Sequence, residues 1–366
     1  MSDTTFRILA INPGSTSTKI AVFENEKEVW STKITHSAEE LAGYDLISDQ
    51  YDFRKEVILN ELEKAGIDIS SFHGIVSRGG LLRPIEGGTY LVDDRLLDDL
   101  RREVQGEHVS NLGALIAKDL AEEADCPSFI VDPVVVDEME NIARYSGHPE
   151  LPRKSIFHAL NQKAVARKAA TRLGKSYSRL NLIVAHLGGG ISVGAHRKGR
   201  IIDVNNALNG DGPFTPERSG GLPVGDLADL CFSGKKTHRE VKKMITGEGG
   251  IVAYLGTNDM LAVEKEVKKG NRRFSEVYEA MAYQIAKEIG GLATVLEGNV
   301  DAIVITGGVA YDKNIIGWIR RRVEFIADII VYPGEMEMEA LAQGALRVLN
   351  GSEEAKRYDP AKGPSR

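Results

Sequence analysis

Three consecutive glycines stand between two apolar runs and could hold a phosphate group. Gly188, Gly189 and Gly190 follow the run 182–186, and the second run spans 191–195. Because glycine has no Cβ, the backbone can reach positive φ there, and an anion can lie against the peptide N–H groups. For an isolated turn, a hairpin without a ligand would be the better interpretation. A second copy of the unit, near the N-terminus, favours phosphate binding instead.

The second copy contains a turn of small hydroxyl residues. The apolar run 8–12 ends in Asn12, and Ser15, Ser17 and Lys19 follow it closely. Hydroxyls, turn amides and a lysine charge can together neutralise phosphate oxygens. The Gly-Lys-Ser/Thr order of a Walker A loop is absent. A hairpin turn that happens to be rich in serine and threonine is the alternative.

Both turns belong to a repeated pattern of strand, turn, strand, turn, strand. Each copy is followed later by an isolated apolar run that ends in paired glycines, at 75–80 and at 303–308. Order and type repeat although the sequences do not, which is typical of a duplicated structural unit. The pattern predicts two related α/β domains that face one cleft. The runs of the two copies are 8–12, 19–23 and 29–34, and 182–186, 191–195 and 201–204.

Charged residues at element ends are further candidates for chemistry. Arg78 ends a predicted strand near Arg83, and a guanidinium can make two parallel hydrogen bonds to a carboxylate. A surface arginine is the alternative. Asp132 ends another strand and could form a turn, or orient a metal-bound water or an arginine. His158 precedes the predicted helix 159–173, where it could face an anion or satisfy a local hydrogen bond.

The second half of the chain adds an arginine and three carboxylates. Arg218 lies in the loop 205–221, which is long for a simple connection. Asp259 could contact a ribose or cap the helix that follows it. Glu337 and Glu339 begin the last helix, where acidic residues favour the helix dipole but could also hold Mg²⁺ near phosphates.

Composition excludes several classes of function. A net charge of −7 without a basic block argues against nucleic-acid binding. No apolar run is long enough to cross a membrane, and the first residues are too polar for a signal peptide. Two cysteines, at 126 and 231, lack metal-ligand spacing, so a reduced, cytoplasmic setting is expected. The charged tail after Gly351, with Pro360 and Pro364, is expected to fray.

Four segments together resemble the acetate and butyrate kinase family, within the superfamily of acetate kinases, sugar kinases, heat-shock ATPases and actin. They are INPGSTSTK (11–19), AHLGGG (185–190), DGPFTPERSGGLPVGDL (211–227) and ITGGVA (305–310). The resemblance implies an α/β fold of duplicated ribonuclease-H-like (actin-like ATPase) domains, each with a mixed five-stranded sheet flanked by helices. It implies an N-terminal domain at 1–150, with the C-terminal helix 335–350 packing back on it. The nucleotide-binding C-terminal domain is expected at 151–334.

Departures from the acetate kinases point toward the butyrate kinases of the family. Acetate kinases usually have Asn where this chain has Gly189, and they carry an arginine near 224–226 that is missing here. By resemblance, the activity is reversible, ATP-dependent phosphorylation of a short-chain carboxylate, butyrate or a branched relative, to an acyl phosphate. Acetate or propionate as substrate is an alternative. An actin-like ATPase that acts in binding or assembly without a small acceptor is another.

The resemblance also assigns roles and partners. ATP/ADP and Mg²⁺ are the implied cofactors, a short-chain fatty acid or its acyl phosphate the implied partner, and a homo-oligomer the expected assembly. Catalytic roles fall on Asn12, Arg78, Asp132, His158 and Arg218, the last as the replacement for the missing arginine. Nucleotide and phosphate contacts fall on Ser15, Ser17, Lys19, His186, Gly188, Gly189, Gly190, Asp259, Gly307 and Gly308. The acyl group would contact Phe157 and Pro216, and the metal Asp132 and Glu339, with Glu337 as an alternative.

The implied reaction needs charge stabilisation more than acid–base chemistry. A carboxylate is already ionised at pH 7, so no general base is required. The enzyme must align it with the γ-phosphorus and spread the developing negative charge. Arg78, His158, Arg218 and Mg²⁺ are expected to do this.

Overall fold

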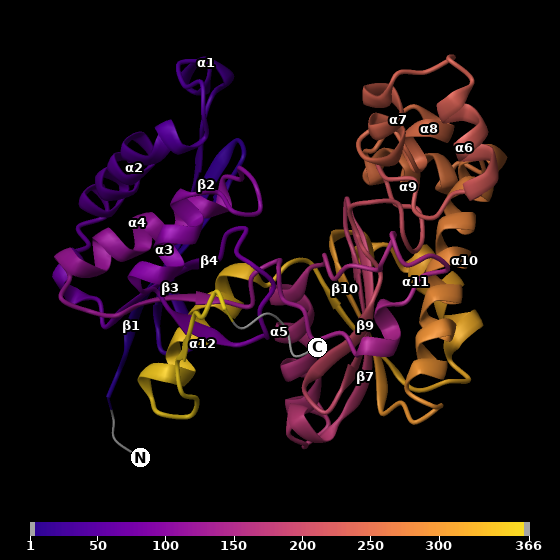
Figure 1. Cartoon of the computed structure of the whole chain (residues 1–366). Coiled ribbons are helices and arrows are strands. Elements are labelled where there is room, and N and C mark those ends of the chain that lie inside the picture. Colours follow the sequence, from indigo (N-terminus) through magenta and orange to yellow (C-terminus); the bar gives the residue numbers. More distant parts are fainter. Residues whose placement is uncertain (1–3, 362–366) are drawn as a thin grey trace. The chain divides into compact units, whose positions relative to one another are not determined.

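The computed structural model describes residues 4–361, which form two compact units (Figure 1). Unit 1 contains the described residues up to Asp137 and from Met336 onward, and unit 2 is Glu138–Glu335. The first boundary falls before the expected one at residue 150 because Glu138 is bonded into unit 2. Its carboxylate contacts Lys163 Nζ at 2.8 Å and accepts from the Ile201 N–H at 2.8 Å.

Unit 1 is built on a mixed seven-stranded sheet with the order β12-β5-β6-β4-β1-β2-β3. β1, β2 and β3 form antiparallel hairpins, whereas β4 pairs parallel with both β1 and β6. The carboxyl ends of β1, β4 and β6 therefore lie at one edge of the sheet. The strands are β1 (Arg7–Gly14), β2 (Ser17–Glu24), β3 (Lys27–Thr35), β4 (Gly74–Arg78), β5 (Thr89–Leu91), β6 (Ser128–Val131) and β12 (Lys356–Arg357).

Two short strands extend this sheet beyond the five that were expected. β5 pairs antiparallel with β6, and β12, from the C-terminal tail, pairs parallel with β5. The next residue, Tyr358, is 1% exposed, and its hydroxyl donates to Asp99 at 2.5 Å. The expected fraying after Gly351 is therefore wrong as far as residue 361, because strand pairing and a buried tyrosine hold the tail. Pro364 lies outside the described residues.

Helices cover both faces of the unit 1 sheet. Leu9 and Ile11 point to the face that packs against α2 and α4. Side chains alternate along a strand, so Ile8 and Ala10 point to the other face, where α12 contacts β1, β4 and β6. The helices are α1 (Ala38–Leu41), α2 (Tyr51–Lys64), α3 (Asp94–Arg101), α4 (Ser110–Glu123) and α12 (Glu337–Leu349).

Unit 2 contains the predicted five-stranded mixed sheet, in the order β11-β10-β7-β8-β9. β7, β8 and β9 are antiparallel, and β10 pairs parallel with β7 and β11. In chain order, β7, β8, β9 and β10 repeat the arrangement of β1, β2, β3 and β4 in unit 1, which confirms the predicted duplication. The strands are β7 (Asn181–Leu187), β8 (Ile191–Arg197), β9 (Arg200–Val204), β10 (Ala302–Gly307) and β11 (Ile329–Pro333).

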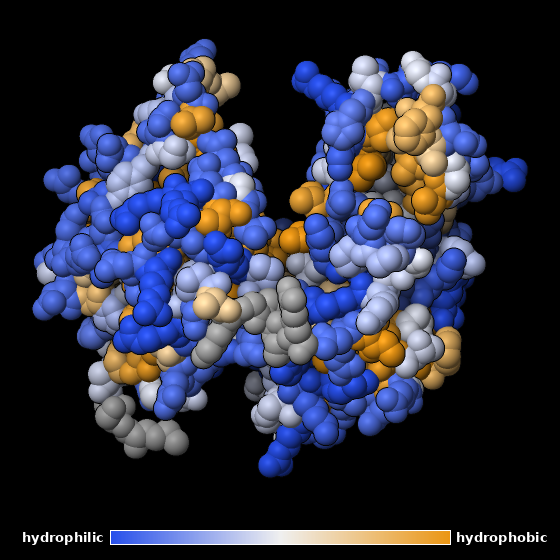
Figure 2. Space-filling model, in the orientation of Figure 1, coloured by the Kyte–Doolittle hydropathy of each residue, from blue (hydrophilic) through white to orange (hydrophobic). Residues whose placement is uncertain are grey.

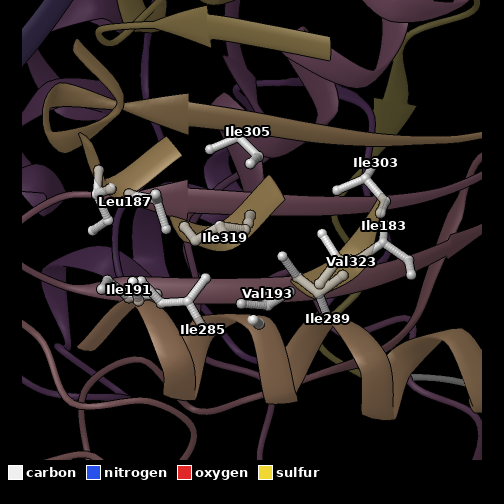
Figure 3. Packing of buried hydrophobic residues seen from close by; sticks show 14 of the residues in the cluster. Ile183, Leu187, Ile191, Val193, Ile285, Ile289, Ile303, Ile305, Ile319 and Val323 are labelled. Atoms are coloured by element: carbon white, nitrogen blue, oxygen red, sulfur yellow. The ribbon is translucent and has the colours of Figure 1, made fainter. Parts of the chain in front are cut away.

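The core of unit 2 lies between this sheet and helices α10 and α11 (Figure 3). Alternate residues of β7, β8 and β10 meet isoleucines of α10 (Arg272–Val295) and branched residues of α11 (Lys313–Val323). Helix α5 (Ala159–Arg172) contacts β7 and β10. The labelled core residues are Ile183, Leu187, Ile191, Val193, Ile285, Ile289, Ile303, Ile305, Ile319 and Val323.

Four shorter helices form an outer lobe of unit 2. Helix α6 has no buried residue, and Val224 and Phe232 at its ends are 77% and 92% exposed. Figure 2 shows hydrophobic side chains on the surface of this lobe. The described residues include no helix with the length and hydropathy needed to span a bilayer. The helices are α6 (Val224–Phe232), α7 (His238–Ile245), α8 (Ile251–Leu255) and α9 (Met260–Lys268).

Candidate active site

The glycine turn of unit 2 joins β7 to β8 and is closed by its own backbone. Gly188 N–H donates to the Gly190 carbonyl at 3.0 Å, and the Thr215 hydroxyl donates to the Gly189 carbonyl at 2.6 Å. A Cβ at position 190 would collide with the guanidinium of Arg218. The turn and the loop that carries Arg218 are thus packed against each other at a distance that only glycine permits.

Arg218 is half-buried beside this turn, and one nitrogen of its guanidinium is unpaired. Its NH1 donates to the Ala207 carbonyl at 2.6 Å, and burial lowers the pKa of Arg218. Its buried Nε has no hydrogen-bond partner among the described residues. An unpaired buried donor costs about 1–3 kcal/mol, and such a group in a native structure calls for a ligand, water or ion. The arrangement is suited to an anion.

Two histidines lie face to face near the same turn. The rings of His158 and His186 stack with centroids 3.9 Å apart and planes 15° from parallel. His158 Nδ1 lies 2.8 Å from the Ser192 hydroxyl, and His186 Nδ1 lies 3.2 Å from Asn161 Oδ1. The buried Nδ2 of Asn161 is a second donor without a partner among the described residues. Unit 2 therefore brings together the glycine turn, Arg218 and both predicted histidines.

The remaining candidates of unit 2 are two residues expected at the acyl group and two glycines at the end of β10. Phe157 is 2% exposed and Pro216 is buried, so their contact with an acyl group stays a prediction. Gly307, at φ 93°, abuts Leu187 at the end of β7 so closely that a Cβ would collide with its carbonyl. Gly308 has open space where a Cβ would lie. Gly307 is therefore required by packing, and Gly308 is accessible to a ligand.

Asp259 caps a helix in this structure. Its Oδ1 accepts from the N–H groups of Leu261 and Ala262, at 2.9 and 3.2 Å, at the start of α9. Both bonds use one oxygen, so the second oxygen stays available to a ribose hydroxyl. The capping alternative is thus realised, and the ribose contact stays a prediction.

In unit 1, one glutamate joins the two strand ends that were predicted to carry chemistry. Asn12 Nδ2 donates to Glu337 Oε2 at 2.6 Å, and Arg78 NH1 lies 3.0 Å from Glu337 Oε1. Asn12 is 6% exposed, whereas about a third of the Arg78 side chain is exposed. Glu339, two residues further along α12, accepts instead from Gln343 at 3.1 Å. The geometry favours Glu337 over Glu339 as the glutamate of the site.

The hydroxyl turn of unit 1 lies directly beyond Asn12. Asn12 is the cross-strand neighbour of Lys19, so both side chains lie on one face of the β1–β2 hairpin. Ser15 at the tip is exposed, and Ser17 is partly buried. These positions suit contact with a phosphate, but the contact itself stays a prediction.

Asp132 follows β6 in an unusual backbone conformation. Its φ is 38°, a left-handed value that non-glycine residues rarely adopt. Its carboxylate is 2% exposed and accepts from the Gly88 N–H at 2.7 Å. Because Val131 is the β6 partner of Arg78 in the sheet register, Asp132 lies at the same edge as Arg78. By contrast, Arg83 pairs with Asp99 at 3.1 Å, which explains it as a structural residue.

Arg54 is a residue of the site that the sequence analysis missed. It lies on α2 at 1% exposure and donates to the carbonyls of Gly14 and Ser15 at 3.0 and 3.1 Å. It also donates to the Thr18 hydroxyl at 3.0 Å. Arg54 therefore fixes the hydroxyl turn from within. The sequence contained a signal for the burial of Arg54. This residue precedes Ile58 by four positions, so both lie on the buried face of α2.

Replacing Arg54 by lysine tests this role. Lysine keeps the charge but has a single donor group, so we expect Arg54→Lys to lower the free energy of unfolding by about 2–4 kcal/mol, from two or more lost bonds. Urea denaturation measures the change. Arg102→Lys is the matched control, because Arg102 forms only an exposed pair with Asp98, worth below about 1 kcal/mol. Equal stability of the two variants would contradict the role.

Comparison with known proteins finds relatives that match almost the whole chain. The chain is 59% identical over 353 residues to butyrate kinase 2 of Clostridium acetobutylicum, covering 96% of this chain and 99% of that protein. Butyrate kinase 1 of the same organism is 56% identical over the same shares of both chains. Residues 145–326 match the model of the acetokinase family.

Solved structures show the same fold at low identity. Acetate kinase from Porphyromonas gingivalis superimposes with a TM-score of 0.77 at 17% identity, covering 94% of this chain and all of that one. A propionate kinase from Francisella tularensis gives 0.71 at 19% identity, covering 93% and 98%. The expected actin-like ATPase fold is thereby confirmed. With two near-full-length relatives above half identity, the chain belongs to the butyrate kinase family.

Proposed function

We propose that this protein transfers the γ-phosphoryl group of ATP directly and reversibly to the carboxylate of butyrate or a branched relative. The product is an acyl phosphate. The observation that carries the proposal is the half-buried Arg218 guanidinium packed against the glycine turn, in a chain 59% identical to a butyrate kinase. A guanidinium held beside a glycine turn is suited to stabilising the charge that develops on a transferring phosphoryl group.

In unit 2 we assign charge stabilisation to Arg218 and His158 and nucleotide contacts to the glycine turn, His186 and Gly308. Peptide N–H groups in a glycine turn can bind phosphate oxygens. Phe157 and Pro216 are assigned to the acyl chain, because apolar side chains beside a carboxylate would exclude water from it. Exclusion of water limits competing hydrolysis of ATP.

In unit 1 we assign phosphate contacts to Asn12, Ser15, Ser17 and Lys19, and contact with the substrate carboxylate to Arg78. Arginine suits this task because its fork matches the two carboxylate oxygens. The Glu337 contact occupies one side of the Arg78 guanidinium and holds the side chain in place.

We propose that carboxylates of unit 1 hold Mg²⁺ together with the nucleotide. The described residues contain no group of three or more metal-binding side chains, as an all-protein cage would require. Mg²⁺ with a nucleotide instead uses one or two carboxylates and completes its shell with water and phosphate oxygens. We propose Asp132 and Glu337 for this, in place of the expected Glu339. When bound, the ion would neutralise charge on the β- and γ-phosphates.

We also propose a cytoplasmic homo-oligomer. Both cysteines are free, as is usual in a reducing compartment. The exposed apolar residues of α6, above all Phe232, support association of copies, since monomers rarely expose such patches.

Paired glutamine substitutions test which glutamate acts. We expect Glu337→Gln to lower kcat/KM by about 10- to 100-fold and to raise the Mg²⁺ concentration needed for half-maximal rate, in line with the usual cost of losing a partner near a metal. Glu339→Gln, on the same helix, is the control and should stay within about twofold. A large loss in Glu339→Gln with little change in Glu337→Gln would show that Glu339 is the metal-associated glutamate.

Acyl phosphate formation across a series of acids tests the substrate. Hydroxylamine trapping with ATP and Mg²⁺ should give the highest kcat/KM with butyrate or isobutyrate, and lower values with acetate, propionate and valerate. Each methylene is worth about 1–3 kcal/mol of discrimination in an apolar pocket. A maximum at acetate would show that acetate is the preferred substrate despite the departures of this sequence from the acetate kinases. ADP release that is independent of any acid would contradict the kinase and favour an actin-like ATPase without a small acceptor.

A further inference from the structure

A chain of buried hydrogen bonds in unit 2 ends at His158. The Tyr177 hydroxyl lies 2.8 Å from His196 Nδ1, and His196 Nε2 lies 3.0 Å from Gln162 Oε1. Gln162 Nε2 lies 2.8 Å from the Ser192 hydroxyl, which lies 2.8 Å from His158 Nδ1. Gln162, Ser192 and His196 are 0% exposed. The direction of each bond can therefore be worked out from donors and acceptors, without competition from bulk water.

The amide of Gln162 has one allowed orientation. Its Nε2 also donates to the Ser192 carbonyl, at 3.1 Å. The opposite orientation would place the amide oxygen against that carbonyl, and two acceptors would face each other. The NH₂ group therefore faces Ser192, and the amide oxygen faces His196.

The tautomer of His196 follows from this orientation. Burial lowers the pKa of His196 well below its usual value, and the charges of Lys163 and Arg167 lower it further, so the ring is neutral. Its Nε2 must carry the proton to donate to Gln162. Its Nδ1 is then an acceptor for the Tyr177 hydroxyl.

The remaining bond, between Ser192 and His158, is fixed in the same way. The Ser192 oxygen accepts from Gln162, and the His158 backbone N–H approaches it at 3.5 Å. Both of these groups are donors. Among the described residues, Nδ1 of His158 is the acceptor within reach of the Ser192 proton. Ser192 therefore donates to Nδ1, and the ring proton of His158 lies on Nε2.

We propose that Gln162, Ser192 and His196 are positioning residues that hold His158 as the neutral Nε2–H tautomer. The inference rests on the proposed role of His158 toward the transferring phosphoryl group. An Nε2–H is a donor that attracts a phosphoryl oxygen, whereas a bare Nε2 would repel it.

The stacked histidine pair agrees with a neutral His158. Two imidazolium rings with centroids 3.9 Å apart would repel each other strongly in a partly buried site. A tautomer set by hydrogen bonds supplies a donor at Nε2 without placing a charge on the His158 ring. Orientation of a catalytic imidazole by a buried partner is a known requirement of histidine chemistry.

Nitrogen NMR of the full-length protein tests the proposal directly. In protein labelled with ¹⁵N-histidine, long-range ¹H–¹⁵N spectra distinguish a protonated Nε2 from a protonated Nδ1. The signal lost in His158→Gln identifies the residue among the eight histidines. We expect the Nε2–H pattern near neutral pH. An Nδ1–H pattern or an imidazolium would overturn the proposal.

Substitutions at Ser192 test whether its hydroxyl sets the tautomer of His158. Ser192→Ala should change the His158 signal to a mixture of tautomers and lower kcat about tenfold, which corresponds to about 1.4 kcal/mol. Ser192→Thr keeps the hydroxyl and should keep the Nε2–H pattern. Ser233→Ala removes an exposed hydroxyl at the end of α6, in the outer lobe of unit 2, and is the control. An unchanged His158 signal in Ser192→Ala would overturn the assignment of the positioning residues.

The two measurements distinguish an error in the proposed role of His158 from an error in its assigned tautomer. If His158→Gln kept full acyl phosphate formation while wild type showed the Nε2–H pattern, the role of His158 would be wrong and the hydrogen-bond chain right. If His158→Gln lost activity while wild type showed Nδ1–H, the chain would be wrong and the role right.

Discussion

The candidate site of unit 2 depends on the packing of one guanidinium against a glycine turn. Arg218 contacts Gly190 so closely that any side chain there would displace it. The loop that carries Arg218 needs glycine again at positions 220 and 250, where φ is positive and a Cβ would collide with neighbouring backbone. Burying a guanidinium is costly unless its donors find acceptors. Arg218 keeps its buried Nε unpaired among the described residues, so part of this cost is not offset within the protein.

Unit 1 holds its own turn with a different arginine. Arg54 donates to the Gly14 and Ser15 carbonyls and to the Thr18 hydroxyl, which also lies 2.9 Å from His36 Nε2. Here the donors are used to order the turn, at whose tip Ser15 is exposed. In unit 1 the arginine supports its turn by hydrogen bonds, whereas in unit 2 the arginine packs against the turn and is proposed to bind an anion.

Local signals were enough to predict most of the fold. The strands of both hairpin units appear as apolar runs between turn residues, and the duplication follows from their order. β5 and β12 were missed because three- and two-residue strands carry little pattern and pair across most of the chain. The choice between Glu337 and Glu339 depends on helix phase, since residues two apart lie on different faces. The chain from Gln162 to His158 depends on how α5 packs against β8, which no local pattern encodes.

The most direct test of the account is kcat for acyl phosphate formation by Arg218→Ala, measured beside its free energy of unfolding and with added guanidinium ion. Losing one preorganised donor typically costs about 10²- to 10³-fold in kcat. We expect a loss of that size in a folded protein, partly restored by guanidinium. A folded variant with kcat within a few-fold of wild type would contradict the account, because the unpaired donor would then have no part in the reaction.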